Sequence, residues 1–477
     1  MDVLLLASEA HPLIKTGGLG DVAGALPAAL RKIGVDARLM IPAFPRPLAI
    51  AQNKQRPLPL GDPLGVGLTR LIPATLPGCE TPVYLVDCPA LFGREGNPYV
   101  DPHGHDWPDN GLRFALLSKA AAMCCSVNSP LNWRPKVLHA SDWQTGLASA
   151  YLNYENGPRP ATVFTIHNIQ FQGMFPKTMV SQARLPPETF SLDGLEFYGQ
   201  VSYLKAGLFY SDAITTVSPT YAEEILTPEG GWGMDGLLRA RRSRLSGILN
   251  GVDYDAWNPG ADSWLAAPFG PDNLDGKIKN KAYLQQEMGL EVDAGAPLLG
   301  VVSRLTEQKG LDLLPPIIDA LLAEGCQLVV LGSGEEDMEH DFTQAAQEYP
   351  GKIAVHIGYD EGLSHRVQAG SDMFLMPSRR EPCGLTQLYA LRYGALPVVR
   401  ATGGLADTVI DMNAGSKGTG FSFSGLTPED LLSTIRRALD LYRQHRKWTA
   451  AQKRAMEQVF TWEKAARSYL DLYQTLA

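Results

Sequence analysis

The sequence is poor in cysteine and has no long apolar run. Its 477 residues contain six cysteines, at positions 79, 88, 124, 125, 326 and 383, and no two have C-x-x-C spacing. This low cysteine content argues against a disulfide-stabilised secreted protein and favours free thiols in a reducing compartment. No segment approaches the roughly 20 apolar residues of a membrane span, and the apolar run at residues 3–7 is too short for a signal peptide. We therefore expect a cytoplasmic protein with no membrane contact.

The sequence also lacks an excess of positive charge. It has 42 Lys and Arg against 51 Asp and Glu, a formal net charge of −9. A general nucleic-acid binder would favour a basic face, so we expect no nucleic-acid partner. The composition, 45% hydrophobic and 19% charged, is that of a globular protein with ample material for a core. The length predicts two or three domains.

Short apolar runs alternate with amphipathic stretches, which is typical of βα units around a parallel sheet. The expected strands fall into two series: residues 3–7, 37–41, 83–87, 136–140, 162–166 and 213–217, and then residues 298–302, 327–331, 353–357, 373–376 and 396–399. We infer two doubly wound, Rossmann-like α/β domains that meet near residues 245–260. Ligands in such folds bind at the carboxyl ends of strands, so we expect the site in the cleft that the two domains face.

The same patterns predict the main helices. Ser218 and Pro219 provide a cap and a first helical position, and one helix is expected to continue through Pro315 and Pro316. Two helices are expected to close the chain. The expected helices cover residues 22–33, 220–226, 310–323, 337–348, 385–393, 428–444 and 462–476.

A glycine-rich loop, Lys15-Thr-Gly-Gly-Leu-Gly-Asp21, lies between the first strand and the first helix. Glycines let backbone N–H groups approach an anion, and the following helix adds its dipole. The loop lacks the pattern of a P-loop or of a dinucleotide-binding site, and a simple tight turn is the alternative. Thr402-Gly-Gly-Leu-Ala-Asp407 repeats its design in the second series, as a second ligand loop or by chance.

Two further loops of the second series carry charged groups. Arg304 and Lys309 follow the strand at residues 298–302, where two cations would suit a departing diphosphate; a solvated surface pair is the alternative. Glu381 lies in a loop before a helix expected near Leu385, whose first N–H groups would bind an anion. A carboxylate beside that pocket suits a sugar that develops positive charge as its phosphate leaves. The alternative is a surface salt bridge from Glu381 to Arg379 or Arg380.

Other polar residues allow more than one interpretation. Asp142 and His167 follow neighbouring strands and could line one cleft, whereas a lone histidine such as His139 or His167 is more often structural. Asp253 and Asp255 form a D-x-D pair that could bind a metal, but the pair lies at the domain junction, and we predict no metal site. Cys383 has no evident histidine partner, so a packing thiol is expected rather than a nucleophile.

Taken together, these segments resemble the bacterial glycogen synthase and plant starch synthase family over essentially the whole chain. The resemblance rests on Lys15-Thr-Gly-Gly-Leu-Gly-Asp-Val22, His139-Ala-Ser-Asp-Trp143, Thr165-Ile-His-Asn168, Asn250-Gly-Val-Asp253, Ser303-Arg-Leu-Thr-Glu-Gln-Lys-Gly310, Glu381-Pro-Cys-Gly-Leu-Thr-Gln387 and Thr402-Gly-Gly-Leu-Ala-Asp407. The chain departs from the family at Arg380, where an aromatic residue is usual.

The resemblance implies a GT-B glycosyltransferase with an acceptor-side domain at residues 1–250, a nucleotide-sugar domain at 251–455, and a last helix at 456–477 that returns to the first domain. It implies a retaining, metal-independent transfer of glucose from ADP-glucose to the 4-hydroxyl end of an α-1,4-glucan, with no cofactor. The implied catalytic residues are Glu381, Arg304, Lys309, His167 and Asp142. The implied donor-binding residues are Lys15, Gly17, Gly18, Asp21, Asn250, Gly332, Tyr359, Cys383, Gly384, Leu385 and Thr386.

Three other functions are compatible with the same fold. They are a UDP-glucose-dependent transferase with a small acceptor, a nucleotide-sugar 2-epimerase and a non-catalytic glucan-binding protein. The convergence of Lys15, Arg304, Lys309 and Glu381 argues against the last, because binding alone does not need it.

Overall fold

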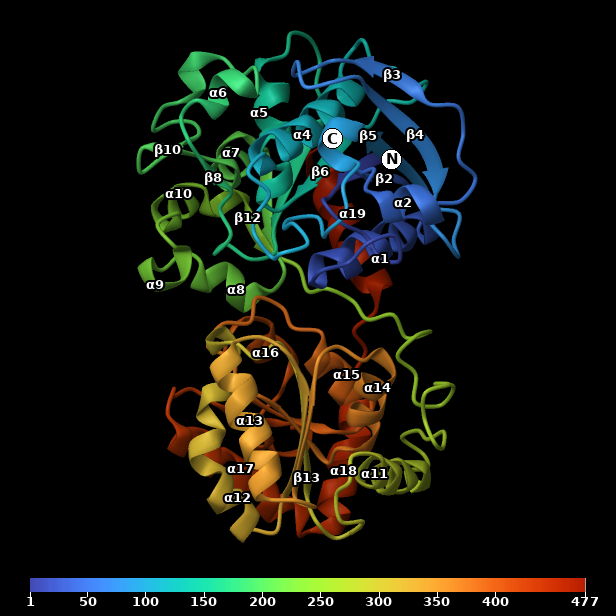
Figure 1. The fold of residues 1–477 in the computed structure, drawn as a ribbon, viewed down its shortest axis with the longest axis vertical. Helices are drawn as coiled ribbons and strands as arrows, with labels where there is room; N and C mark the ends of the chain where they lie inside the picture. Colours follow the sequence, from blue (N-terminus) through green and yellow to red (C-terminus); the bar gives the residue numbers. More distant parts are fainter. Residues whose placement is uncertain (477) are drawn as a thin grey trace. The chain divides into compact units, whose positions relative to one another are not determined.

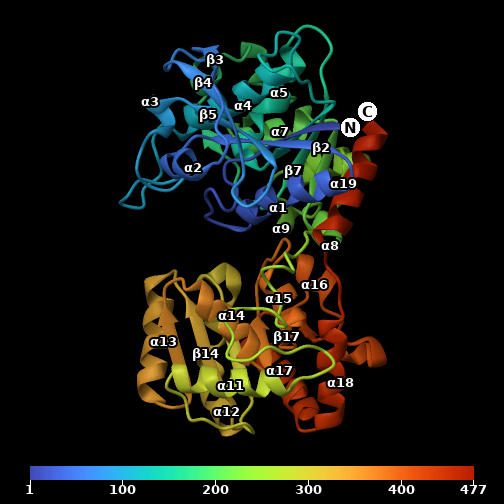
Figure 2. The ribbon, with the colours of Figure 1, turned by 90° about the vertical axis from the view of Figure 1, so that its right-hand side faces the viewer.

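The computed structural model describes residues 1–476 and divides into two compact units. Unit 1 contains Met1–Gly251 and the C-terminal segment from Trp462, and unit 2 contains Val252–Thr461. Each unit is built on one main β-sheet with helices on both faces (Figures 1 and 2). A parallel sheet needs this cover because both of its faces are apolar.

The main sheet of unit 1 has nine strands, parallel except at one edge. In spatial order they are β12 (Leu245–Gly247), β11 (Ala213–Thr216), β7 (Ala161–Ile166), β6 (Val137–Ser141), β1 (Asp2–Leu6), β2 (Asp36–Pro42), β5 (Pro82–Asp87), β4 (Thr69–Thr75) and β3 (Leu58–Gly61). The last two strands run antiparallel to their neighbours. A small antiparallel sheet contains β8 (Met174–Phe175), β10 (Gln200–Ser202) and β9 (Glu196–Phe197).

Alternating residues of β1 build the two cores of unit 1. Leu4 and Leu6 belong to the core that contains α4 (Asn110–Cys125), α5 (Leu147–Tyr154) and the start of α7 (Tyr203–Tyr210). Val3 and Leu5 belong to the opposite core, with α1 (Gly18–Lys32) and the C-terminal α19 (Trp462–Leu476). The last helix therefore packs beside α1 in unit 1, as both ribbon views show. Shorter helices are α2 (Pro45–Ile50), α3 (Pro89–Phe92), α6 (Met179–Gln182), α8 (Pro219–Glu224), α9 (Pro228–Gly231) and α10 (Asp235–Ala240).

Unit 2 is a six-stranded, fully parallel doubly wound sheet. The order is β15 (Ile353–Ile357), β14 (Gln327–Gly332), β13 (Leu298–Val302), β16 (Met373–Met376), β17 (Leu396–Arg400) and β18 (Phe421–Phe423). Its helices are α11 (Asp275–Glu287), α12 (Ile318–Ala323), α13 (Glu336–Glu348), α14 (Glu361–Gly370), α15 (Thr386–Arg392), α16 (Gly403–Thr408), α17 (Pro428–Tyr442) and α18 (His445–Met456). The expected strands of both series are confirmed to within one residue at each end.

Two helix predictions differ from the structure. Helix α1 begins at Gly18 rather than at residue 22, so part of the glycine-rich loop is its first turn, with Gly17 as an extended N-cap. The segment at 310–323 is a series of 3₁₀ turns, and only Ile318–Ala323 is α-helical. Pro315 and Pro316 cause this, because proline lacks the N–H that an α-helix needs and clashes with the preceding turn.

The sequence pattern failed to predict several helices. Helix α4 is buried on nearly all sides and so has no amphipathic period. Helix α11 buries a polar face, Lys277, Asn280 and Lys281, at helical spacing, so an apolar pattern cannot reveal it. Helix α18 is a third helix near the C-terminus, where two were expected. The predicted start of α8 is confirmed, because the Ser218 side chain accepts a hydrogen bond from the Tyr221 amide.

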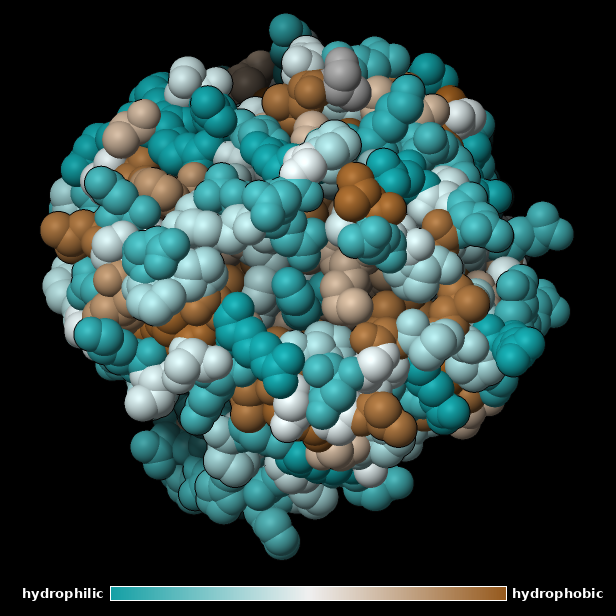
Figure 3. Space-filling view, turned by 90° about the horizontal axis from the view of Figure 1, so that it is seen from above, coloured by the Kyte–Doolittle hydropathy of each residue, from teal (hydrophilic) through white to brown (hydrophobic). Residues whose placement is uncertain are grey.

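Within residues 1–476, every helix is too short or too polar to cross a membrane. On the face drawn in Figure 3, hydrophilic side chains dominate and hydrophobic ones lie singly or in small groups. Scattered apolar side chains of this kind are normal for a folded protein surface.

Candidate functional site

The strand order places several of the predicted site residues near one point of each sheet. In unit 1 the chain adds strands first on the β2 side of β1 and then on its β6 side, and in unit 2 β13 divides β14 from β16 in the same way. Doubly wound sheets bind ligands outside the carboxyl ends of strands at such a reversal. Asp142 directly follows β6, and the loops of Lys309 and Glu381 follow β13 and β16.

Glu381 and Lys309 form an ion pair inside unit 2. Lys309 Nζ lies 2.6 Å from Glu381 Oε2, and the Ser378 hydroxyl donates a hydrogen bond of 3.1 Å to the same oxygen. The Glu381 residue is only 6% exposed. Two side chains that were predicted to serve the sugar and the phosphates separately are therefore in contact, and each compensates the charge of the other.

The alternative of a surface salt bridge between Glu381 and Arg379 is wrong. Arg379 donates two hydrogen bonds to Asp312, at 2.5 and 2.7 Å, and its side chain turns to that carboxylate. Asp312 lies in the first 3₁₀ turns after β13, so the pair ties the loop after β16 to the loop after β13. The Arg379 amide adds a hydrogen bond to the Gln308 carbonyl at 2.9 Å.

A close backbone approach fixes Lys309 beside Glu381. The next residue, Gly310, has a left-handed φ of +67°, and a Cβ there would lie 2.1 Å from the Pro377 carbonyl oxygen. Only glycine allows both the conformation and the approach. In the same loop the Thr306 hydroxyl is buried without a hydrogen-bond partner among the described residues, and Arg304 is exposed. The loop thus offers unsatisfied polar groups beside a fixed cation.

The second glycine-rich segment packs against the backbone of Glu381. The Gly404 amide donates to the Glu381 carbonyl at 3.0 Å. A Cβ on Gly403 would lie 2.0 Å from that carbonyl oxygen, and a Cβ on Gly404 would lie 2.0 Å from the Cys383 carbonyl oxygen. These glycines are explained by the protein's own packing, which holds the Glu381 loop in place.

The residues after Glu381 lead into the short helix α15. Cys383 is buried, Gly384 has a φ of +71°, and Leu385 is the N-cap. The first N–H groups of a helix have no intrahelical acceptor, so the amides near Thr386 are available at this end. The Gln387 side chain closes the turn by donating to the carbonyls of Cys383 and Gly384.

Gly332 and Tyr359 occupy different surroundings. A Cβ on Gly332 would lie 1.8 Å from the Ser303 carbonyl oxygen, so this glycine lets the β14 end approach the β13 loop. Tyr359 follows β15 and is 76% exposed. An exposed aromatic ring at this edge has the geometry to stack on a flat ligand group.

In unit 1, Asp142 and His167 are brought together as predicted. Asp142 Oδ1 accepts a hydrogen bond of 2.7 Å from the His167 amide, and Asp142 has an uncommon left-handed φ of 58°. Burial raises the pKa of Asp142 to about 7, and burial lowers the pKa of His167 to about 4. The His167 Nε2 is buried without a hydrogen-bond partner in the described chain. An orphaned polar atom and a carboxyl group that titrates near neutrality are typical of a functional site.

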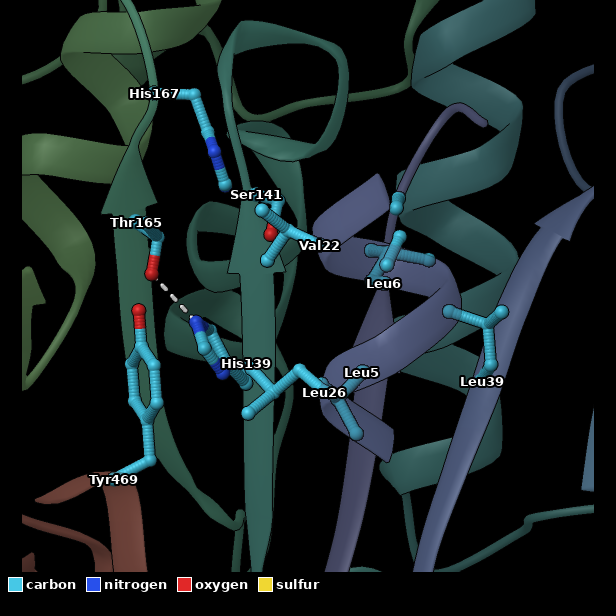
Figure 4. Close-up of a pocket in the computed structure, with 12 residues that line it drawn as sticks. Leu5, Leu6, Val22, Leu26, Leu39, His139, Ser141, Thr165, His167 and Tyr469 are labelled. Carbon is cyan, nitrogen blue, oxygen red and sulfur yellow. Dashed lines mark hydrogen bonds between the residues drawn. The ribbon is translucent and has the colours of Figure 1, made fainter. Parts of the chain in front are cut away.

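His139 is structural by its contacts. Its Nδ1 lies 2.7 Å from the Tyr473 hydroxyl and its Nε2 lies 2.5 Å from the Thr165 hydroxyl. Figure 4 shows the second contact between neighbouring strands, with Tyr469 from α19 beside it and apolar side chains from α1 and β1 around a small cavity. Burial lowers the pKa of His139 to about 3, so it is a neutral member of the core.

The first glycine-rich loop is open. Lys15 Nζ lies 2.8 Å from Asp21 Oδ1, so two predicted donor-binding residues form an ion pair. A Cβ on Gly17 or Gly18 would meet no atom within 4 Å, so the fold does not explain these glycines. Asn250, near the end of the first part of unit 1, is buried, and its Oδ1 has no hydrogen-bond partner within residues 1–476.

The structure adds contacts that the sequence did not predict. Glu9 is 2% exposed and accepts hydrogen bonds from the amide and the hydroxyl of Thr16. Tyr99 donates to the other Glu9 oxygen at 3.2 Å. The only signal in the sequence was an acidic residue three positions after a central strand, which is weak. Ser378, beside Glu381, had no signal at all.

The D-x-D pair has a local structural role. Asp253 Oδ1 accepts hydrogen bonds from the amides of Asp255 and Ala256 at 2.9 and 3.3 Å, which makes an Asx turn. Among residues 1–476, no group of three or more His, Cys, Asp or Glu side chains is placed to hold a metal ion.

Comparisons with known proteins agree on one family. The model described as "Starch synthase catalytic domain" matches residues 2–240, and "Glycosyl transferases group 1" matches residues 286–455. Proteins named glycogen synthase are 51% identical in Rhodospirillum rubrum and 52% identical in Paramagnetospirillum magneticum, each over 100% of this chain and 98% of the relative.

Two of the solved structures that resemble this chain have the same two-domain architecture. The catalytic domain of starch synthase IV from Arabidopsis thaliana, bound to ADP and acarbose, has a TM-score of 0.88 and 30% identity, over 99% of this chain and 98% of that one. A sucrose-phosphate synthase from Thermosynechococcus elongatus has a TM-score of 0.60 and 16% identity, over 100% of this chain and 98% of that one, and it supports the fold alone.

Proposed function

Because the chain belongs to the glycogen synthase and starch synthase family of glycosyltransferases, we propose that it transfers glucose from ADP-glucose to the end of an α-1,4-glucan and releases ADP. Its two Rossmann-like units have the GT-B fold of that class. The names of the relatives support a glucan product, and the ADP bound to the plant enzyme supports an adenine nucleotide. Glucose is transferred to the 4-hydroxyl with its anomeric configuration retained.

The observation that carries the proposal is the ion pair of the buried Glu381 with the partly buried Lys309 at the strand reversal of unit 2. When the bond from the anomeric carbon to the phosphate breaks, the glucosyl group develops positive charge. A fixed carboxylate stabilises that charge, and it needs little reorganisation because Lys309 and Ser378 already hold it. Glu381 is therefore assigned to the sugar.

The negative charge of the departing ADP is assigned to the cations and helix amides of the same loops. Lys309 and Arg304 follow β13 and present cations, and the amides of Leu385 and Thr386 stand at the start of α15. Charge-assisted hydrogen bonds from such groups contribute roughly 1.5–3 kcal/mol each. Gly384 and Cys383 shape this turn, Gly332 brings the end of β14 close to the β13 loop, and Tyr359 is assigned to the adenine ring.

Unit 1 contributes the remaining groups. Lys15, Gly17, Gly18 and Asp21, in the open loop at the start of α1, are assigned to the donor. Asp142, His167 and Asn250 orient the glucose, and the orphaned Nε2 of His167 and Oδ1 of Asn250 are the atoms that gain partners when the sugar binds.

Donor choice is the experiment that tests this function. ADP-glucose and UDP-glucose are compared with glycogen as acceptor, and labelled glucose is counted in precipitated glucan. We expect transfer from ADP-glucose that survives EDTA. Activity only with UDP-glucose and a small acceptor would refute the proposal, and loss of substrate without labelled glucan would indicate an epimerase. Dependence on added Mn²⁺ would restore Asp253 and Asp255 as metal ligands.

A pair of lysine variants tests the placement of the diphosphate. Lys309→Ala should raise the KM for ADP-glucose far more than it weakens glycogen binding, because the cation is assigned to the donor. The matched control is Lys352→Ala, which removes another ion-paired lysine of unit 2. Lys352 is well exposed, and its Nζ lies 2.5 Å from Glu291 Oε2. An equal loss of donor use and glycogen binding in Lys309→Ala would contradict the assignment.

A further inference from the structure

The carboxylate of Glu9 lies beneath the glycine-rich loop of unit 1. Glu9 follows β1 by three residues, at the same strand reversal as Asp142. The residue is 2% exposed, and its Oε2 accepts hydrogen bonds from both the amide and the hydroxyl of Thr16, the second at 2.9 Å. Thr16 itself is exposed and lies between Lys15 and Gly17. One buried group thus holds the middle of an exposed loop.

The second oxygen of Glu9 is fixed from another part of the chain. Tyr99, 90 residues away, donates to Glu9 Oε1 at 3.2 Å and shares a hydrogen bond of 2.8 Å with the Ser8 hydroxyl. The Tyr99 backbone is held in turn, since its carbonyl accepts from the Asn110 side chain at 2.8 Å. The carboxylate therefore has both oxygens oriented before any ligand binds.

The amide and hydroxyl of Thr16 do not need a buried carboxylate as their hydrogen-bond acceptor. Water can hydrogen-bond the amide and hydroxyl of an exposed threonine, whereas burying a carboxylate costs free energy. Burial raises the pKa of Glu9. The hydrogen bonds from Thr16 favour the charged form and offset only part of this rise. A Cβ on Gly17 or Gly18 would meet no atom within 4 Å, so packing does not fix these two glycines. The His11 amide holds the end of the loop through the Gly20 carbonyl at 2.9 Å, and the buried Glu9 carboxylate holds its middle at Thr16.

We propose that Glu9 is a positioning residue that fixes Thr16 and thereby places Lys15 and Gly17 for the phosphates of the donor. The proposal rests on the donor-binding role of that loop in the proposed function. Glu9 does not itself contact the donor; it acts through Thr16, and Tyr99 orients it.

Two variants of Glu9 separate positioning from charge. Glu9→Ala removes the acceptor and should raise the KM for ADP-glucose roughly 10–100-fold, the effect of losing charge-assisted hydrogen bonds, with a much smaller change in kcat. Glu9→Gln retains one carbonyl oxygen for Thr16, and its amide can donate to Tyr99, so it should restore the KM to within about threefold of wild type. ADP binding by calorimetry should follow the same order.

Asp212→Asn is the matched control. Asp212 is a partly buried carboxylate of unit 1 that accepts from Arg159 and Thr162 at the opposite, amino end of the strands. It should lower the melting temperature while leaving the KM for ADP-glucose unchanged. Glu9→Ala with an unchanged KM, or Glu9→Gln as impaired as Glu9→Ala, would overturn the positioning role. Wild-type protein that transfers no glucose from ADP-glucose would instead overturn the proposed function, before any variant is compared.

Discussion

Two loops of nearly the same sequence, Thr16-Gly-Gly-Leu-Gly-Asp21 and Thr402-Gly-Gly-Leu-Ala-Asp407, use the first two glycines of each for opposite reasons. In the first, a Cβ on Gly17 or Gly18 would meet nothing within 4 Å; in the second, a Cβ on Gly403 or Gly404 would lie 2.0 Å from a carbonyl oxygen. The first loop leaves room for something outside the fold, and the second leaves room for the Glu381 loop. Equal motifs therefore do not imply equal roles.

The buried histidines of the two units differ in a similar way. In unit 1, burial lowers the pKa of His139 and His167 to about 3 and about 4, so both are neutral. In unit 2, His365 stacks on Trp257 at 3.7 Å, and its Nδ1 lies 2.6 Å from Asp262 Oδ2. Although burial alone would lower the pKa of His365, the hydrogen bonds to Asp262 and Glu361 raise it. Proximity to a carboxylate, rather than burial, distinguishes the two environments.

The largest effect on activity is expected at Glu381, whose backbone the second glycine-rich loop packs against. Glu381→Ala should lower kcat by roughly 10²–10³-fold, because a preorganised charge that stabilises the transition state is removed. Steady-state rates at saturating ADP-glucose and glycogen measure this. The control is Glu291→Ala, which removes a surface carboxylate of unit 2 and should leave kcat unchanged. A kcat near that of wild type would remove Glu381 from the chemistry.

Gly404→Ala should damage both folding and activity. The added methyl would displace the Cys383 and Glu381 backbone, so we expect the free energy of unfolding to fall by about 1–3 kcal/mol and kcat to fall at least roughly tenfold. Denaturant unfolding and steady-state kinetics on the same preparation measure the two effects. A variant with both properties intact would show that the second loop, like the first, has free space.

Gly17→Ala should affect only the donor. Gly17 has an extended conformation that any residue adopts, so the free energy of unfolding should fall by no more than about 1 kcal/mol, the cost of alanine at a helix N-cap. The methyl group would occupy the space that we assign to the donor, and the KM for ADP-glucose should rise about tenfold. An unchanged KM together with an unchanged stability would mean that no ligand approaches this loop.

The smallest effect concerns His365. Its folded pKa is raised above the unfolded value, so its stabilising contribution is fully present below about pH 6.5 and is lost as the pH rises through the folded pKa. His365→Gln should therefore lower the free energy of unfolding by on the order of 1 kcal/mol more at pH 6 than at pH 9. Denaturant unfolding of both proteins across that range measures the difference. A difference that grows with pH would contradict a charged His365.

Much of the fold could be predicted because its signals are local. Each buried parallel strand is an apolar run of a few residues, and the strand bounds in both units follow those runs closely. The proline after Ser218 predicted a helix start for the same reason. Helices α4 and α11 escaped prediction because one is buried on nearly all sides and the other buries Lys277 and Lys281, whose amino groups donate to backbone carbonyls brought close by folding.

For the candidate site too, local features could be predicted from the sequence and long-range contacts could not. That Lys309 and Glu381 each follow a strand could be inferred, because parallel strands end at one edge of a sheet. That the two form a buried pair could not, because they lie 72 residues apart and the approach of Gly310 to Pro377 brings them together. Glu9 was missed because its partners, Thr16 and Tyr99, contact it only after the loop folds over it.

The main strands of both series, the two-unit plan and the placement of polar motifs at strand ends were determined by the sequence alone, since short apolar runs encode them. Tertiary structure decided which glycines border open space and which allow another backbone segment to approach. It also decided which charged side chains form ion pairs. Those properties depend on distances of a few ångströms between segments far apart in the chain, and no local pattern contains them.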